Sequence, residues 1–313
     1  MALGRMPEGA ARGLPVTHRR AVALMVLCTL MWSIAGVVTR HLDAARSFEV
    51  TFWRSAFNAV ALLLALLAIR GRALAVDLRT GGVALWFSGL CWGVMYTNFM
   101  LALTLTTVAT VLVTMAIGPL VTALFSRVFL QHRLPARTWS AIGLAAVGIA
   151  WMFGRQALAG GSSMTGALVA LGVPLAAAAN WTLLQHLHQR HASDPSVQEP
   201  QMLPAVLIGA LLSAAVTLPL ALPLSATPLD LGLLALLGVV QLAIPCLIVV
   251  RLAKVLAAPE ISLLGLLEVI FGVLLAWVGA GEAPGSEALV GGTLVLVALI
   301  GNQWWALRER ESS

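Results

Sequence analysis

The sequence has few charged residues and only one tyrosine. Asp, Glu, Lys and Arg make up 10% of its 313 residues, whereas about a quarter of the residues of a soluble globular protein are charged. Apolar residues account for 60% of the chain, about 188 side chains, and a soluble fold could not cover so many with polar surface. This composition excludes soluble, disordered, collagen-like and disulfide-scaffold proteins.

Residues and motifs that carry chemistry are also scarce. The cysteines Cys28, Cys91 and Cys246 all lie inside apolar runs, which favours buried thiols over a disulfide framework or a metal site. The sequence contains no G-x-x-x-x-G-K-[ST] phosphate loop, no H-E-x-x-H motif and no G-x-S-x-G motif. We therefore expect no cofactor and no catalytic residues. Any step that requires energy would draw on a gradient and not on ATP bound by this chain.

Two further classes of partner are disfavoured. His186, His188 and His191 are close in sequence, but no carboxylate or cysteine stands at ligand spacing, which favours solvated histidines over a metal site. The net charge of +6 is scattered between apolar runs and does not gather on one face, as nucleic-acid binding requires. The expected partners are the lipid bilayer and a small-molecule substrate.

The apolar residues are arranged in long runs. Because one membrane span takes about 20 residues, the composition predicts nine or ten spans. The runs are solid and rich in Ala and Leu, which favours helices over alternating strands. Reading between polar breaks gives ten segments, at about 21–39, 50–69, 82–103, 107–130, 138–154, 165–185, 202–222, 229–250, 258–278 and 288–307. The sequence thus predicts an all-α polytopic membrane protein with ten transmembrane helices.

The positive charges alternate between the two sides of these spans. One side holds only Arg40, Arg46 and Arg155. The opposite side holds 15 basic residues, namely Arg5, Arg12, Arg19, Arg20, Arg70, Arg72, Arg79, Arg127, Arg133, Arg137, Arg190, Arg251, Lys254, Arg308 and Arg310. Because basic loops stay in the cytoplasm, we expect both termini to be cytoplasmic, in a bacterial-type inner membrane. Residues 1–20 and 308–313 would be the cytoplasmic tails.

The two halves of the chain align at an offset of about 150 residues. In this alignment Pro119 of the fourth span pairs with Val269 of the ninth. With an offset of 149, Trp32 of the first span pairs with Trp181 of the sixth. An odd number of spans in each half inserts the halves with opposite orientation. Such inverted repeats place a site at the midplane and let one half rock against the other. The predicted repeats are 21–155 and 165–307.

Short motifs in this order resemble a known family. They are Trp32-Ser33, Phe52-Trp53-Arg54-Ser55-Ala56, Ala102-Leu103, Gly118-Pro119, Asn180-Trp181, Gly281-Glu282 and Gly291-Gly292. From about 21 to 307 the chain resembles a ten-helix, EamA-type member of the drug/metabolite transporter superfamily. The resemblance implies a central cavity lined by spans one to four and six to nine, and export or exchange of small metabolites such as amino acids. The family often has Glu-Pro in span nine, whereas here Val269 follows Glu268.

Two charged residues within the predicted spans, Arg54 and Glu268, are candidate site residues. An ionised acid as deep as Glu268 costs at least about 2.5–3.5 kcal/mol on insertion scales, so Glu268 faces a cavity, is paired or is protonated. It suits a proton-coupling or substrate-ammonium site, or else a neutral acid in helix packing. Arg54 is a candidate for binding a substrate carboxylate. Alternatively, it snorkels to the interface or pairs with Asp43 or Glu49.

Aromatic residues provide further candidates. Trp92, Tyr96 and Phe99 share one face of the third span, with Asn98 nearby, although such a stripe serves packing more often than recognition. Trp32 and Trp181 stand mid-span at related positions of the two halves, away from the interfacial belts, and are candidates to wall a cavity.

The remaining candidates are polar or helix-breaking residues near the midplane. Ser33, Thr114, Asn180 and Gln241 suit contacts with substrate, or hydrogen bonds between helices. The gating candidates interrupt helices mid-span, namely Gly118, Pro119, Pro174 and Pro245.

The sequence favours a secondary active carrier that exports small metabolites by alternating access, coupled to protons or to exchange. A passive channel would need a polar-lined pore, and an intramembrane enzyme would need a catalytic constellation, so both are weaker alternatives. Small residues such as Gly143, Gly148 and Gly291-Gly292 allow close helix approach, within the chain or in a homodimer.

Overall fold

The computed structural model is helical throughout the part of the chain that it describes. The described residues are 17–39, 41–45, 47–106, 111, 114–131, 134–159, 164–194, 196, 200–280 and 285–311, and no β-strand occurs among them. The expectation of an all-α protein is thus confirmed for these ranges.

Helices occupy all ten predicted segments. In chain order they are α1 (His18–Ser33) with α2 (Ala35–Thr39), α3 (Ser47–Arg70), α5 (Gly82–Leu105), α7 (Gly118–Phe129), α8 (Ala136–Ala159), α9 (Met164–Ser193), α10 (Pro204–Ala221), α11 (Pro228–Leu236) with the π-helix η1 (Leu237–Ala243) and α12 (Ile244–Leu252), α13 (Ala258–Gly265) with α14 (Leu267–Ala280), and α15 (Ser286–Glu311). A short helix that the hydropathy pattern does not predict, α4 (Ala73–Thr80), lies between α3 and α5.

Length and hydropathy identify six stretches that could cross a membrane. Within the described residues these are His18–Thr39, Phe48–Arg70, Met164–Ser193, Pro204–Ala221, Pro228–Leu252 and Ala258–Leu275. The helices are therefore those of a polytopic membrane protein, while the number of ten spans stays a prediction. Large apolar side chains such as Leu64, Phe129 and Val278 are exposed on the outside of the bundle, where lipid would cover them.

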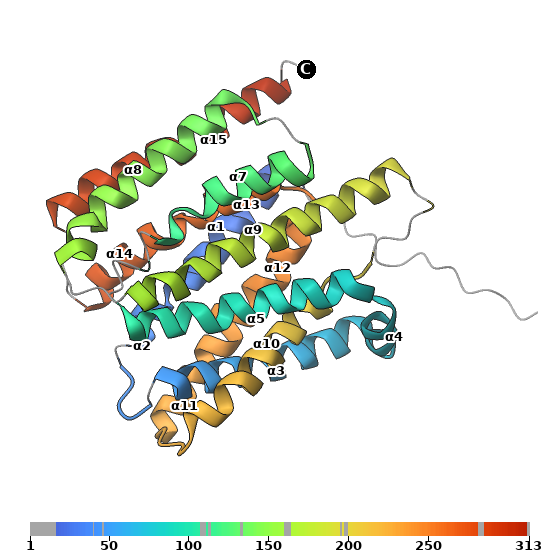
Figure 1. The fold of residues 1–313 in the computed structure, drawn as a ribbon, viewed down its shortest axis with the longest axis vertical. Coiled ribbons are helices and arrows are strands. Elements are labelled where there is room, and N and C mark those ends of the chain that lie inside the picture. The colour runs from blue at the N-terminus through green and yellow to red at the C-terminus, as the bar shows by residue number, and fades with distance from the viewer. Residues whose placement is uncertain are drawn as a thin grey trace, which may run out of the picture.

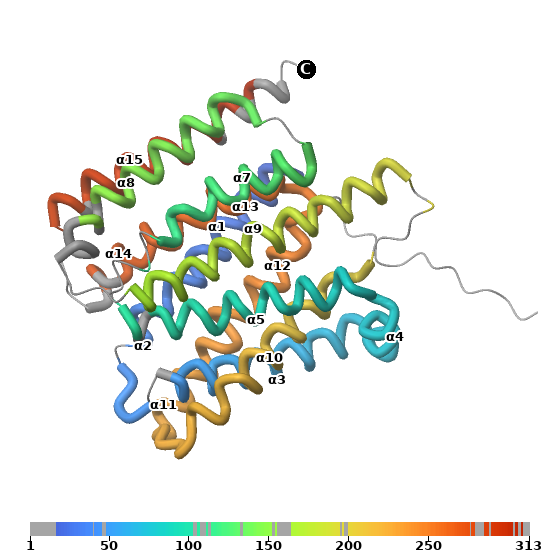
Figure 2. Tube along the Cα trace, viewed as in Figure 1, coloured from blue at the N-terminus to red at the C-terminus, as the bar shows by residue number. Residues whose placement is uncertain are grey.

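The helices pack in a pattern that repeats between the two halves. α5 packs against α9 and α10, and the matching stretch η1–α12 packs against α1, with η1 also against α3. α7 packs against α9, and the matching α13 and α14 pack against α1. The pairs α3 with α10, α7 with α13, and α8 with α15 each join one element to its own counterpart. Figures 1 and 2 show α8 beside α15 along one edge of the bundle.

Prolines shape these helices in different ways. Pro245 has no N–H to donate to the carbonyl of Gln241, and its ring would clash with that carbonyl in a regular helix. The wider π-turn just before it, in which the N–H of Ile244 donates to the carbonyl of Val239, avoids this clash. Pro174, by contrast, lies inside an uninterrupted α9, so the expected interruption at this residue is absent.

Candidate functional site

A cavity of about 170 Å³ lies at the centre of the bundle. Drug-sized ligands occupy pockets of about 300–1,000 Å³, so a cavity of this size suits a smaller solute. Its walls come from every predicted span from one to nine except the fifth and the seventh (α10). The lining residues are Met25, Trp32, Arg54, Trp92, Met95, Tyr96, Phe99, Met115, Gly118, Pro119, Val173, Pro174, Ala177, Trp181, Gln241, Leu242, Cys246, Ile261, Ser262, Gly265, Leu266, Glu268 and Val269.

Aromatic side chains from both halves form one wall of this cavity. The ring centroids of Trp92 on α5 and Trp181 on α9 lie 5.4 Å apart at an angle of 82°. Trp92 also packs against Tyr96, with 5.6 Å between the centroids. Edge-to-face and tilted pairs at these distances are favourable and rigid, so the wall is preorganised for an apolar solute body.

Arg54 is buried in the middle of the molecule and faces the cavity. Its side chain is 1% exposed, and its Nη2 donates a hydrogen bond to the carbonyl of Tyr96 at 3.1 Å. Its Nε has no partner, and among the described residues no carboxylate lies within 4.0 Å of the guanidinium. The structure thus shows neither snorkelling to the interface nor an ion pair with Asp43 or Glu49.

Glu268 faces the same cavity from the first turn of α14. The preceding break between α13 and α14 at Leu266 places this carboxylate near the N-terminus of α14, where the helix dipole favours a negative charge. Within the described part of the chain its carboxylate makes no hydrogen bond or ion pair, although it is near enough to Arg54 for attraction between the two charges. The cavity therefore holds a guanidinium and a carboxyl group that form no ion pair with each other.

Gln241 supplies a further polar group of the cavity. It lies in the π-helix η1, and its Nε2 donates to the carbonyl of Trp32 at 3.2 Å. Its Oε1 is buried without a partner. A free carbonyl oxygen at the cavity wall can accept a hydrogen bond from a bound solute.

Four of the polar candidates do not line the cavity. Ser33 donates to the carbonyl of Leu30 within its own helix, and Thr114 is half-buried elsewhere. Asn98 and Asn180 bridge helices instead. The Nδ2 of Asn98 donates to the carbonyl of Val169 at 3.1 Å, and the Oδ1 of Asn180 accepts from the Ser88 hydroxyl at 2.6 Å.

The gating candidates Gly118, Pro119 and Pro174 line the cavity, whereas Pro245 does not. At Gly118 three helices approach closely, because a Cβ added there would lie 3.4 Å from Oγ of Ser262 on α13 and 3.7 Å from Cβ of Pro174 on α9. This crossing joins α7 to its counterpart in the second half.

Comparison with known proteins gives a family match for the first part of the chain. The sequence from 19 to 154 matches the EamA-like transporter family. Residues 19–154 are an EamA-like transporter domain. Together with the apolar helices, this makes the chain a multi-pass membrane protein related to transporters of small solutes.

The fold is also found among solved structures. A protein described only as "Crystal structure of protein" superposes with a TM-score of 0.76 at 18% sequence identity, over 93% of this chain and 98% of the other. In all, 28 chains of solved structures are significantly similar. No curated protein matches the chain in sequence. The shared fold extends beyond the EamA-like domain into the second half.

Other lining residues were not expected from the sequence. Met25, Met95 and Met115 from three predicted spans of the EamA-like domain face the cavity, together with Ser262 of the second half. The sequence has ten methionines, and nothing in their spacing distinguishes these three. Methionine is flexible and polarizable, so these side chains can adapt the wall to solutes of different shape.

The two halves are also joined by buried acids at the end of the bundle opposite the basic loops. Asp230 on α11 accepts hydrogen bonds from the backbone N–H groups of Asp43, Ala44 and Ala45 at 2.8, 3.1 and 3.2 Å. It also forms a capping box with Thr227 at the start of α11. Figure 1 shows the 41–45 loop and α11 together at this end.

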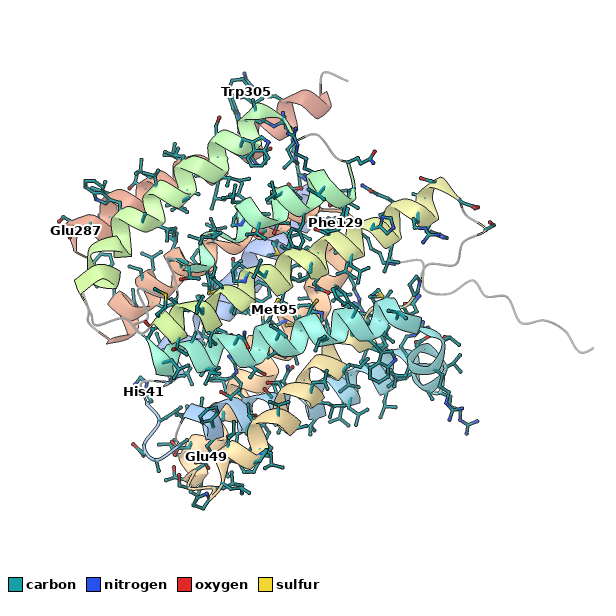
Figure 3. The ribbon with its side chains drawn as sticks, viewed as in Figure 1. His41, Glu49, Met95, Phe129, Glu287 and Trp305 are labelled. Carbon is teal, nitrogen blue, oxygen red and sulfur yellow. The ribbon has the colours of Figure 1, made fainter. Side chains whose placement is uncertain are left out.

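Glu49 makes the matching connection from the other half. Its carboxylate accepts hydrogen bonds from the N–H and hydroxyl of Ser225, both at 2.8 Å, and from the N–H of Ala226 at 2.7 Å. Figure 3 shows Glu49 and His41 near this end of the bundle. We call Glu49, Asp230 and the loops 41–45 and 222–227 the outer clasp.

Proposed function

We propose that the chain is a secondary active carrier of the inner membrane that exports small amphipathic metabolites, such as amino acids, by alternating access. The observation that carries this proposal is the central cavity, in which an unpaired guanidinium and an unpaired carboxylate face the same space beside an aromatic wall. Such a cavity complements a small zwitterion with an apolar side chain.

Each cavity group has a role in this proposal. Arg54 holds the substrate carboxylate, because a guanidinium with free N–H groups makes charge-assisted hydrogen bonds to it. Glu268 either holds the substrate ammonium or carries a proton when no ammonium is bound. Trp92 and Trp181 pack against the apolar side chain.

The arrangement of the two halves favours alternating access. Counterpart helices pack against each other in three pairs, and helices of both halves line the cavity, as expected if inverted repeats rock about it. The outer clasp connects the halves at one end and must break whenever the cavity opens there. A continuously open channel would have no need for such a closure.

Counterflow in proteoliposomes tests the proposal. The purified chain is reconstituted into proteoliposomes that are loaded with an unlabelled amino acid, and the labelled amino acid is added outside. The assay is repeated across a panel of substrates, with and without a pH gradient. A carrier accumulates label transiently above equilibrium, whereas a channel only equilibrates it. Absence of counterflow for the whole panel, with label equilibrating, would favour the channel and overturn the proposal.

A further inference from the structure

A second cavity, of about 210 Å³, lies at the end of the bundle that carries the basic loops. It is formed by the C-terminal part of α9, the residues that lead into α10, and the end of α12 with the turn that follows. It shares no lining residue with the central cavity. The transport cycle proposed above makes no use of it.

The lining of this cavity divides into apolar walls and a cationic rim. Leu184 and Leu187 of α9 form walls together with Leu203. Arg251 at the end of α12 and Lys254 in the turn that follows are both exposed and both line this cavity. Gln201, Met202, Val250 and Ala253 complete the lining.

We propose that this second cavity binds the phosphate of an anionic phospholipid headgroup. A guanidinium and an ammonium side by side hold a phosphate oxygen pair by charge-assisted hydrogen bonds. The apolar walls suit the glycerol and the first ester carbons of a lipid, whereas a free phosphate would leave them uncovered. Basic residues at the cytoplasmic end of a span meet the negative surface of the inner leaflet, which favours a lipid over a soluble anion.

Native mass spectrometry of the full-length chain in detergent tests this site. The probes are phosphatidylglycerol, phosphatidylcholine and glycerol phosphate at matched concentrations. We expect one phosphatidylglycerol to remain bound, with at least tenfold weaker retention in R251Q/K254Q. The control R72Q/R79Q removes two exposed arginines near the same end of the bundle and should retain the lipid as the parent chain does.

Three results would overturn the proposal. One is equal retention of phosphatidylglycerol by the parent chain and by R251Q/K254Q. Another is an equal loss in R72Q/R79Q, which would reduce the effect to net charge. The third is tight binding of glycerol phosphate at the same residues, which would make the ligand soluble. Equal thermal unfolding of both variants without lipid checks that they fold, and counterflow activity is a separate measurement, so this proposal can fail without the carrier proposal.

Discussion

Arg54 and Glu268 bring a guanidinium and a carboxyl group, two groups that can carry opposite charges, to one cavity. Burying an unpaired charge is costly, and replacing its lost hydration requires hydrogen bonds that the described residues only partly supply. A substrate with both a carboxylate and an ammonium would supply the missing hydrogen-bond partners of both side chains at once. We therefore predict that the two side chains bind different ends of the same solute.

Replacing Arg54 tests the carboxylate end. We expect R54Q to lower counterflow of the best amino acid by about 10- to 100-fold, because a hydrogen bond to a charged group contributes roughly 1.5–3 kcal/mol. An amino acid amide, which lacks the carboxylate, should lose far less. Equal losses for both substrates, with unchanged thermal unfolding, would assign Arg54 a structural role.

Replacing Glu268 tests proton coupling. In E268Q the carboxylate can no longer take up or release a proton, so an imposed pH gradient should no longer stimulate uptake, while exchange between the two sides continues. D194N is the control, because Asp194 is exposed outside the predicted spans and its carboxylate accepts hydrogen bonds from Ser196 alone among the described residues. A pH response in E268Q equal to that of the parent chain would contradict this role.

At the scale of elements, the structure depends on close approach between helices. Gly209 on α10 faces α5 so tightly that an added Cβ would lie 2.8 Å from the backbone N of Gly93 and 3.0 Å from the carbonyl oxygen of Gly89. Because these are backbone atoms, the two helices would have to separate. Small residues have this role in many membrane proteins.

The substitution G209A should therefore destabilise the protein by about 1–3 kcal/mol, as expected for overpacking. G232A is a matched control, because nothing lies within 4 Å of a Cβ added to this exposed glycine. Thermal unfolding in detergent measures both. A G209A transition at or above that of G232A would show that α5 and α10 can separate at little cost.

The outer clasp makes a second prediction at this scale. The hydroxyl of Ser225 donates to the carbonyl of Ala44 at 3.2 Å, so A44C/S225C places two thiols across the halves. Joining them with a short thiol-reactive linker should stop counterflow, since the outer end can no longer open. A reducible linker should restore transport when it is cleaved. The native cysteines are buried, and the unsubstituted chain treated in the same way controls for their reaction. Full activity of the cross-linked protein would show that the outer clasp does not have to open during transport.

The sequence predicts where the helices lie better than it predicts which side of each helix faces the cavity. Long apolar runs mark helices, so all ten segments contain helix, but a helix that is apolar all round gives no periodic signal for its cavity side. Trp32 and Ser33 are neighbours, yet only Trp32 lines the cavity. Arg54 and Glu268 could be predicted because a charge within a span is rare, whereas Met95 and Met115 could not, because methionine is ordinary there.

On the scale of the whole molecule, charge asymmetry sets the expected orientation. The exposed Arg72 and Arg79 are the N-cap and a last-turn residue of α4, and Figure 1 shows α4 at the end of the bundle opposite α11 of the outer clasp. Because basic loops remain in the cytoplasm, the clasp should face outward, and export then requires the cavity to load from the basic end. The question that remains for experiment is which end of the bundle faces the cytoplasm.

Single cysteines at the two ends answer it. A membrane-impermeant maleimide applied to intact cells should label H41C, at the clasp end, and should label R72C only after permeabilisation. The native cysteines are buried, so background labelling should be low in the unsubstituted chain. Labelling of R72C in intact cells and not of H41C would contradict the expected orientation and would move the proposed lipid site to the outer leaflet.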